Sequence, residues 1–259
     1  MAQRALPESG RDQTRVARLG RRTGAAEAEG APGAVLLLLP GGGVERSARR
    51  PAPGAGVRAL TLARRLVAGA TDEVLVGHVV RYRCRGWNDA AADPVRDAEW
   101  ALDEVVRRYG DVPVCLAGVD MGARAALRAA GHPAVAGVLG LGPLLPAAGV
   151  DEEPVRQLTG RRVLIVHGTD DVRTDPELSY RLAERAKKVN ADVCRFEVHT
   201  DGHGLRQRRA EVVALGRDFV GGVLCGRDFA RPVVDAMAAP PPLGLRMPLA
   251  EGFGRSLRP

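Results

Sequence analysis

A single aspartate flanked by glycines is the residue of this sequence best placed to do chemistry. Asp120 lies at the centre of the segment GVDMG (residues 118–122), between an apolar run (112–116) and an alanine-rich run (123–130). The first run predicts a buried strand and the second predicts a helix, so the glycines fall in a sharp strand-to-helix turn. Such a turn holds its central side chain near the free N–H groups of a helix, which favour negative charge. A carboxylate in that position can act as a nucleophile or as a general base.

The segment GVDMG resembles the G-x-S-x-G nucleophile elbow of the α/β-hydrolase fold family, with Asp120 in the place of the usual serine. Aspartate stands at this position in the haloalkane dehalogenases and epoxide hydrolases of that family. The resemblance implies an α/β fold, with a mostly parallel, doubly wound sheet and helices on both faces. It implies a protein of the size of dienelactone hydrolases and small esterases, without a large cap domain.

Two later segments supply the acid and the histidine that this resemblance requires after the elbow. VLIVHGTDD predicts a strand that ends in the pattern H-G-x-x-D, which places the acid at Asp171. HTDGHGL presents His203 in a glycine-flanked loop beyond the last predicted strand. The competing residues are Asp170, Asp175 and His199. Asp171 and His203 also suit turns without any catalytic role. Their order after Asp120 is what favours a catalytic triad.

The loop after the first buried strand is the expected oxyanion hole. Residues 34–39 (AVLLLL) predict that strand, and Pro40 and three glycines follow it. In the family this strand ends in His-Gly, and the next residue donates a backbone N–H to the oxyanion. Here Pro40 replaces the histidine, and the resemblance places the donor at Gly42, with the backbone N–H of Met121 as the second donor. A plain glycine-rich loop is the alternative interpretation.

The rest of the central region alternates between strand and helix patterns. Strands are predicted at 73–82, 135–141, 163–167 and 192–199, and helices at 57–68, 95–109, 176–189 and 210–224. Strands separated by helix-sized stretches predict a parallel sheet that is covered on both faces. Residues 142–160 are too few for the helical cap that many members of the family insert there.

The two ends of the chain differ in composition from this α/β-hydrolase domain, which we place at residues 34–226. Residues 1–33 form a polar segment in which TRVARL (14–19) predicts an edge strand. Residues 227–259 hold three successive prolines and show no helical period, which predicts a disordered tail or an extended arm. The apolar side chains of this tail leave open that it docks on this molecule or on a partner.

Composition narrows the class of partner. The net charge is +7, but the arginines are spread along the chain and only 3% of residues are aromatic, which argues against a nucleic-acid partner. No apolar window is long enough to span a membrane, and the N-terminus lacks the apolar core of a signal peptide. We therefore expect a cytoplasmic protein with a small-molecule substrate. Arg81, Arg85 and Arg173 are candidates for facing an anionic substrate.

The four cysteines are dispersed, without a CxxC pair, and several lie in apolar runs. This pattern favours buried thiols over disulfides or a metal site. We expect neither a metal nor a cofactor.

The predicted function is hydrolysis of a small organic electrophile, such as an ester, a lactone or an epoxide, at an Asp–His–Asp site. Asp120 is ionised near neutral pH and can attack saturated carbon, after which His203, oriented by Asp171, activates water against the alkyl-enzyme ester. Met121 stands where the dehalogenases and epoxide hydrolases carry tryptophan, which weighs against their activity. A histidine between two carboxylates tends to keep its proton. The alternatives are therefore a non-hydrolytic acid–base enzyme (a cyclase, lyase or isomerase) and a catalytically silent binding protein.

Overall fold

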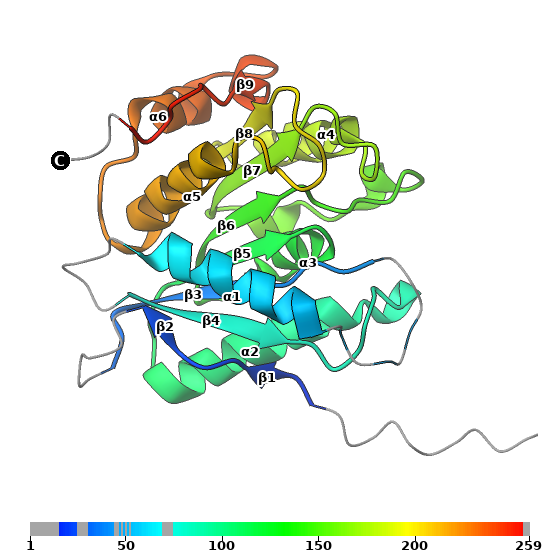
Figure 1. The fold of residues 1–259 in the computed structure, drawn as a ribbon, viewed down its shortest axis with the longest axis vertical. Helices are drawn as coiled ribbons and strands as arrows, with labels where there is room; N and C mark the ends of the chain where they lie inside the picture. Colours follow the sequence, from blue (N-terminus) through cyan, green and yellow to red (C-terminus); the bar gives the residue numbers. More distant parts are fainter. Residues whose placement is uncertain are drawn as a thin grey trace, which may run out of the picture.

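Apolar runs form the centre of a nine-stranded sheet in the computed structural model (Figure 1). The structure describes residues 16–24, 31–43, 47, 49, 51, 53–68 and 75–255. The strands are β1 (Arg18–Leu19), β2 (Thr23–Gly24), β3 (Ala34–Leu39), β4 (Leu75–Arg81), β5 (Val114–Val119), β6 (Val135–Leu141), β7 (Arg162–Gly168), β8 (Val193–Val198) and β9 (Met247–Pro248). Their order is β1-β4-β3-β5-β6-β7-β8-β9, and β2 also pairs with β4. In the order β4-β3-β5-β6-β7-β8-β9 each strand is parallel to its neighbours, whereas β1 and β2 are antiparallel to β4.

Helices cover both faces of the sheet, which explains why β3 is apolar and buried at every position. The helices are α1 (Pro53–Val67), α2 (Asp93–Tyr109), α3 (Met121–Ala129), α4 (Pro176–Lys187), α5 (Arg209–Leu224) and α6 (Arg231–Ala238). Short 3₁₀ turns are η1 (Asp89–Ala91), η2 (Val150–Glu152), η3 (Arg156–Leu158) and η4 (Leu243–Leu245). One apolar core lies under α2, α3 and α4, and the other lies under α1, α5 and α6 (Figure 1). The predicted fold class is confirmed.

The connection between β6 and β7 is as short as the sequence indicates. It holds only the two 3₁₀ turns η2 and η3, and no helical domain is inserted there. The edge strand predicted within residues 14–19 is present as β1, although residues 14 and 15 lie outside the described part of the chain. None of the helices in the described ranges is both long and apolar enough to cross a membrane.

The prediction that the C-terminal segment lacks a helix is wrong. Residues 231–238 form α6, with a proline in its first turn, where a missing N–H costs no hydrogen bond. Val233 and Ala236 bury its inner face, and β9 then joins the sheet beside β8. An eight-residue helix is too short to display a clear period in the sequence, which is why the pattern was missed. The open possibility that this segment docks on its own molecule is confirmed.

Two of the four cysteines are the buried thiols that the sequence predicts. Cys115 and Cys194 lie in the middle of β5 and β8 and are fully buried. Burial raises the pKa of Cys194 to about 12, so this thiol is not a thiolate near neutral pH.

Candidate active site

Asp120 lies at a strained turn between β5 and α3. Its backbone has φ 57° and ψ −121°, a conformation that residues with a side chain rarely adopt. The flanking glycines are a steric requirement of the turn. A Cβ atom on Gly118 would overlap the backbone of Gly122, and one on Gly122 would overlap the carbonyl oxygen of Leu39. The predicted strand, sharp turn and helix are therefore confirmed, with Asp120 at the tip.

The structure brings Asp120, Asp171 and His203 together at the carboxyl edge of the sheet. The Nδ1 atom of His203 lies 2.9 Å from Oδ2 of Asp171, and its Nε2 atom lies 3.8 Å from Oδ1 of Asp120. Asp171 belongs to the loop that follows β7, and His203 belongs to the loop that follows β8. The carboxyl ends of parallel strands are where ligands bind in open α/β sheets.

The two carboxylate oxygens of Asp120 have different surroundings. Oδ2 accepts a hydrogen bond from Nη2 of Arg173 at 3.1 Å, and the same nitrogen donates to the carbonyl oxygen of Gly42 at 3.1 Å. Oδ1 is buried and has no hydrogen-bond partner within the described part of the chain. Because an unpaired buried carboxylate oxygen is costly, such an atom is a sign of function. Oδ1 is the oxygen that faces His203.

Asp171 is held as an ionised carboxylate. The hydroxyl of Thr174 donates to its Oδ2 at 2.6 Å, and the backbone N–H groups of Thr174 and Arg173 donate to its Oδ1 at 3.0 Å and 2.9 Å. Burial acts to raise the pKa of Asp171, but these bonds and the one from His203 outweigh it and lower the pKa to about 2. An ionised Asp171 keeps a proton on Nδ1 of His203, so that Nε2 is the nitrogen available to a reacting group.

The imidazole of His203 lies between two carboxylates. The interaction with Asp120 is the largest cause that raises the pKa of His203, and Asp171 adds to it, whereas partial burial opposes both. His203 is therefore protonated to a higher pH than an isolated histidine.

A second histidine, His167, also contacts the carboxylate of Asp171. Nε2 of His167 lies 3.3 Å from Oδ2 of Asp171, and Nδ1 lies 2.8 Å from the hydroxyl of Ser179. Burial, with the nearby charge of Arg195, lowers the pKa of His167 to about 4, so its ring is neutral near pH 7. His167 therefore shapes the loop rather than transferring protons to a substrate.

The network continues from Ser179 to the C-terminal segment. Nε of the buried Arg195 donates to the hydroxyl of Ser179 at 2.9 Å, and Nη1 donates to the carbonyl oxygen of Leu245 at 2.9 Å. Its charge is balanced by Glu197, 2.7 Å away. A chain of hydrogen bonds therefore connects the acid of the site to the segment that adds β9 to the sheet.

Gly42 and Met121 lie next to each other at the mouth of the turn. A Cβ atom on Gly42 would lie 2.7 Å from Cε of Met121. Met121 is the first residue of α3, and the N–H groups of a first helical turn have no partner inside their helix. The structure shows Gly42 bonded through its carbonyl group, to Arg173. That the N–H groups of Gly42 and Met121 bind an oxyanion remains a prediction.

The competing residues have surroundings unlike those of Asp171 and His203. Asp170 and His199 are exposed, and Asp175 caps α4 by accepting a hydrogen bond from the backbone N–H of Glu177 at 2.9 Å. The sequence alone indicates Arg173 only as a candidate for binding an anionic substrate. It does not indicate the contact of Arg173 with Asp120. In the described ranges, no group of three or more His, Cys, Asp or Glu side chains could hold a metal ion.

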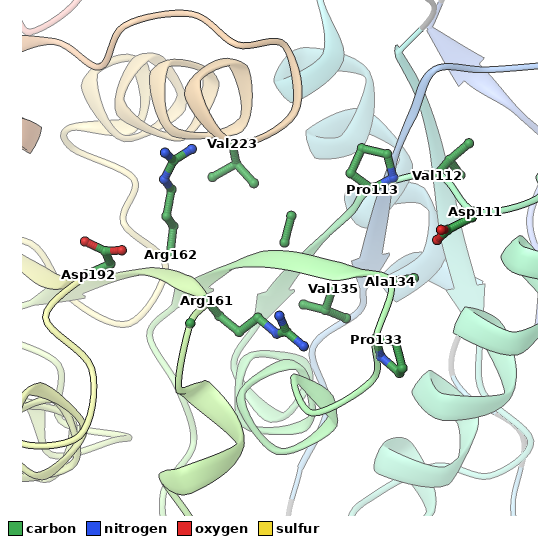
Figure 2. Close-up of a pocket in the computed structure, with 12 residues that line it drawn as sticks. Asp111, Val112, Pro113, Pro133, Ala134, Val135, Arg161, Arg162, Asp192 and Val223 are labelled. Carbon is green, nitrogen blue, oxygen red and sulfur yellow. The ribbon is translucent and has the colours of Figure 1, made fainter.

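A hollow of about 580 Å³ lies at the opposite edge of the sheet (Figure 2). It is lined by residues at the amino ends of β5 to β8, and its arginines hold backbone groups. Nε of Arg161 donates to the carbonyl oxygen of Ala130 at 3.2 Å, and Nη1 of Arg162 donates to that of Gly222 at 3.1 Å. These two arginines therefore hold the C-terminal ends of α3 and α5.

The strand order, the two helical layers and the sharp turn after β5 define the α/β-hydrolase fold. An α/β serine hydrolase homologue from Coxiella burnetii is similar, at 18% identity and a TM-score of 0.55 over 74% of this chain and 86% of that chain. A propionate-bound thermophilic esterase from Thermogutta terrifontis is similar at 17% identity and a TM-score of 0.59, over 82% and 92%. A protein from Thermus thermophilus is similar at 20% identity and a TM-score of 0.55, over 76% and 91%. At these identities the likeness establishes the fold. No protein-family model and no curated protein sequence matches the chain.

Proposed function

We propose that the protein is a hydrolase in which the carboxylate of Asp120 attacks a small organic electrophile. One observation carries this proposal: the buried Oδ1 of Asp120, which has no hydrogen-bond partner among the described residues, faces Nε2 of His203 at 3.8 Å, while Nδ1 of His203 is bonded to Asp171. The fold that the chain shares with an esterase and a serine hydrolase homologue supports hydrolysis as the class of reaction.

The first half of the reaction forms an ester on Asp120. Oδ1 attacks a saturated carbon, and the bond from this carbon to its leaving atom breaks, with the electron pair going to the leaving atom. Attack on a carbonyl carbon would instead give an anhydride, so epoxides and alkyl compounds with good leaving groups fit better than simple esters. Protonated His203 donates its Nε2 proton to the departing oxygen of an epoxide, which its raised pKa favours.

The second half hydrolyses that ester. Neutral His203 takes a proton from water, whose oxygen attacks Cγ of Asp120. Because Oδ1 now carries the alkyl group, the developing negative charge falls on Oδ2, which Arg173 contacts at 3.1 Å. A fixed guanidinium at the atom where charge develops stabilises the transition state. The bond from Cγ to Oδ1 then breaks, and the product leaves as an alcohol with the proton from His203. Asp120, which now carries one oxygen from water, gives its remaining acid proton to His203, which restores the carboxylate and the protonated imidazole.

The raised pKa of His203 also favours a second candidate, a non-hydrolytic acid–base enzyme. In that case Oδ1 of Asp120 removes a proton from the substrate, and protonated His203 donates one elsewhere in a cyclisation, elimination or isomerisation. No bond then forms between Asp120 and carbon.

The experiment that tests the proposal compares the wild-type protein with variants at position 120. Wild type is assayed on styrene oxide, 1-chlorobutane and a γ-lactone, and Asp120→Ser and Asp120→Ala are assayed on p-nitrophenyl acetate. We expect wild type to hydrolyse at least one electrophile, and Asp120→Ser to gain esterase activity over Asp120→Ala, since a serine there would face the same imidazole. Failure of both assays would contradict the proposal and leave the acid–base enzyme and the binding protein as interpretations.

A further inference from the structure

A pocket of about 810 Å³ lies between β1, the first half of α1 and the carboxyl end of β4. Its lining includes the apolar residues Val57, Leu60, Val79, Pro40 and Pro51, together with Tyr82. Figure 1 shows these elements at the β1 side of the sheet, where α1 covers β4. No acidic side chain is among its described lining residues.

Four arginines of this pocket have no ion-pair partner among the described residues. They are Arg18, Arg21, Arg64 and Arg81. Arg83 also lines the pocket but is already bound to Asp93, 3.1 Å away, and to Asp97. These arginines lie beside the apolar lining residues. A pocket with both apolar and charged lining suits a ligand that has an apolar body and one charged end.

Two of these arginines are placed against each other by the sheet. In the antiparallel pairing of β1 with β4, Arg18 is directly opposite Arg81. Like charges directly opposite in a sheet are destabilising. An anion between two guanidinium groups turns this repulsion into two charge-assisted contacts.

The pocket shares a wall with the active site. Gly41 lines the pocket, and a Cβ atom on Gly41 would lie 3.3 Å from Cβ of Asp120. The hydroxyl of Tyr82, another lining residue, donates to the carbonyl oxygen of Pro40 at 3.2 Å. A ligand in the pocket is therefore separated from Asp120 by little more than the backbone of the glycine loop.

We propose that this pocket binds an organic anion, with a carboxylate or phosphate group at the arginines and a hydrocarbon body against the apolar lining residues. The pocket adjoins the proposed active site across the glycine loop, and this relation between the two sites rests on the proposed hydrolase function. Charged residues on edge strands also discourage sheets from joining edge to edge. That role alone predicts no affinity for small anions.

Calorimetric titration with octanoate, octyl phosphate and 1-octanol tests the pocket without relying on turnover. We expect at least one of the two anions to bind about tenfold or more tightly than 1-octanol, since a charged hydrogen bond contributes that much affinity. The comparison of the two anions shows whether a carboxylate or a phosphate is preferred. Arg64→Gln and Arg81→Gln should each weaken anion binding by about tenfold.

Arg65→Gln is the matched control, because Arg65 follows Arg64 on α1, is exposed and does not line the pocket. It should leave anion binding unchanged. Arg81→Gln should also raise Tm in the absence of ligand, since it removes the repulsion from Arg18. Equal binding of all three ligands, or equal losses in Arg64→Gln and Arg65→Gln, would overturn the proposal.

Titrating wild type and Asp120→Asn separates this proposal from the proposed function. If both proteins bind the anion and wild type hydrolyses no electrophile, the pocket stands and the hydrolase function fails. If wild type hydrolyses an electrophile but binds neither anion, the pocket proposal fails alone.

Discussion

Charged residues differ in their contacts between the amino ends and the carboxyl ends of the strands, which we call the amino edge and the carboxyl edge of the sheet. At the amino ends of the strands lie Arg161 and Arg162 (Figure 2), which donate to backbone carbonyl groups at the C-terminal ends of α3 and α5. At the carboxyl ends, Asp120 has a strained φ of 57°, and its buried Oδ1 has no hydrogen-bond partner within the described residues. Strain and an unmade hydrogen bond persist only where the surrounding structure enforces them, and they cluster at functional sites. The comparison favours the carboxyl ends of the strands as the place for the proposed chemistry.

The same substitution at the two edges should give the largest contrast. Asp120→Asn should lower kcat for the electrophile by more than about 10⁴-fold, because an amide is a poor nucleophile and a poor base. Asp192→Asn changes an exposed carboxylate that lines the hollow at the amino edge, and it should leave kcat unchanged. Steady-state assays of both variants check this, and equal losses would contradict the contrast.

Arg173→Ala should give the next largest effect. Hydrolysis of the Asp120 ester should slow by about 10²–10³-fold, the loss seen when one donor to an oxyanion is removed. Release of the leaving group should stay fast, so the ester should accumulate and be visible by mass spectrometry of the intact protein. Val172→Ala is the control, since Val172 is adjacent and fully exposed. A slower reaction without accumulation would show that Arg173 acts elsewhere.

The rate of ester hydrolysis should rise with pH, because this step requires neutral His203. In the ester Asp120 carries no charge, so only Asp171 acts to raise the pKa of His203, and the midpoint of this step should lie below the pKa of His203 in the free protein. Charged His203 also contributes to the free energy of unfolding of the free protein. This contribution is full below about pH 6.5 and is lost as the pH rises through the raised pKa of His203. Asp171→Asn should move the midpoint to lower pH by removing one negative charge. Single-turnover rates across pH measure both midpoints, and an unchanged midpoint would contradict the assigned pairing.

The smallest effect is expected at the amino edge. Arg161→Met removes donors to the carbonyl groups of Ala130 and His132, so the free energy of unfolding should fall by about 0.5–1.5 kcal/mol. Turnover should not change. Urea unfolding measures the change in stability, and steady-state assays measure turnover. A loss of turnover as large as that of Arg173→Ala would contradict the contrast between the amino and carboxyl ends of the strands.

Much of the fold and the three central residues of the site could be predicted from local pattern. Runs such as AVLLLL are buried on both faces, and the glycines around Asp120 report a steric need that holds in any protein with this turn. The positions of Asp171 and His203 follow from the strands that precede them. Each of these predictions rests on a stretch of only a few consecutive residues.

The rest depends on contacts between distant segments. Arg173 reaches Asp120 only because the loop after β7 folds back over the glycine loop. The sequence indicates no partner for His78, which is bonded to the carbonyl group of Gly20 and to the hydroxyl of Tyr109. Arg195 is fully buried within an apolar strand, and its contact with Leu245 requires the C-terminal segment to dock. No local periodicity encodes such pairings.

A single-turnover reaction in heavy-oxygen water tests most directly whether Asp120 forms a bond to the substrate. The protein is held in excess over styrene oxide, and the peptide that contains Asp120 is then analysed by mass spectrometry. Hydrolysis through an ester on Asp120 predicts one heavy oxygen in its carboxylate, because water attacks Cγ. Complete conversion with label in the diol and none in Asp120 would contradict covalent attack.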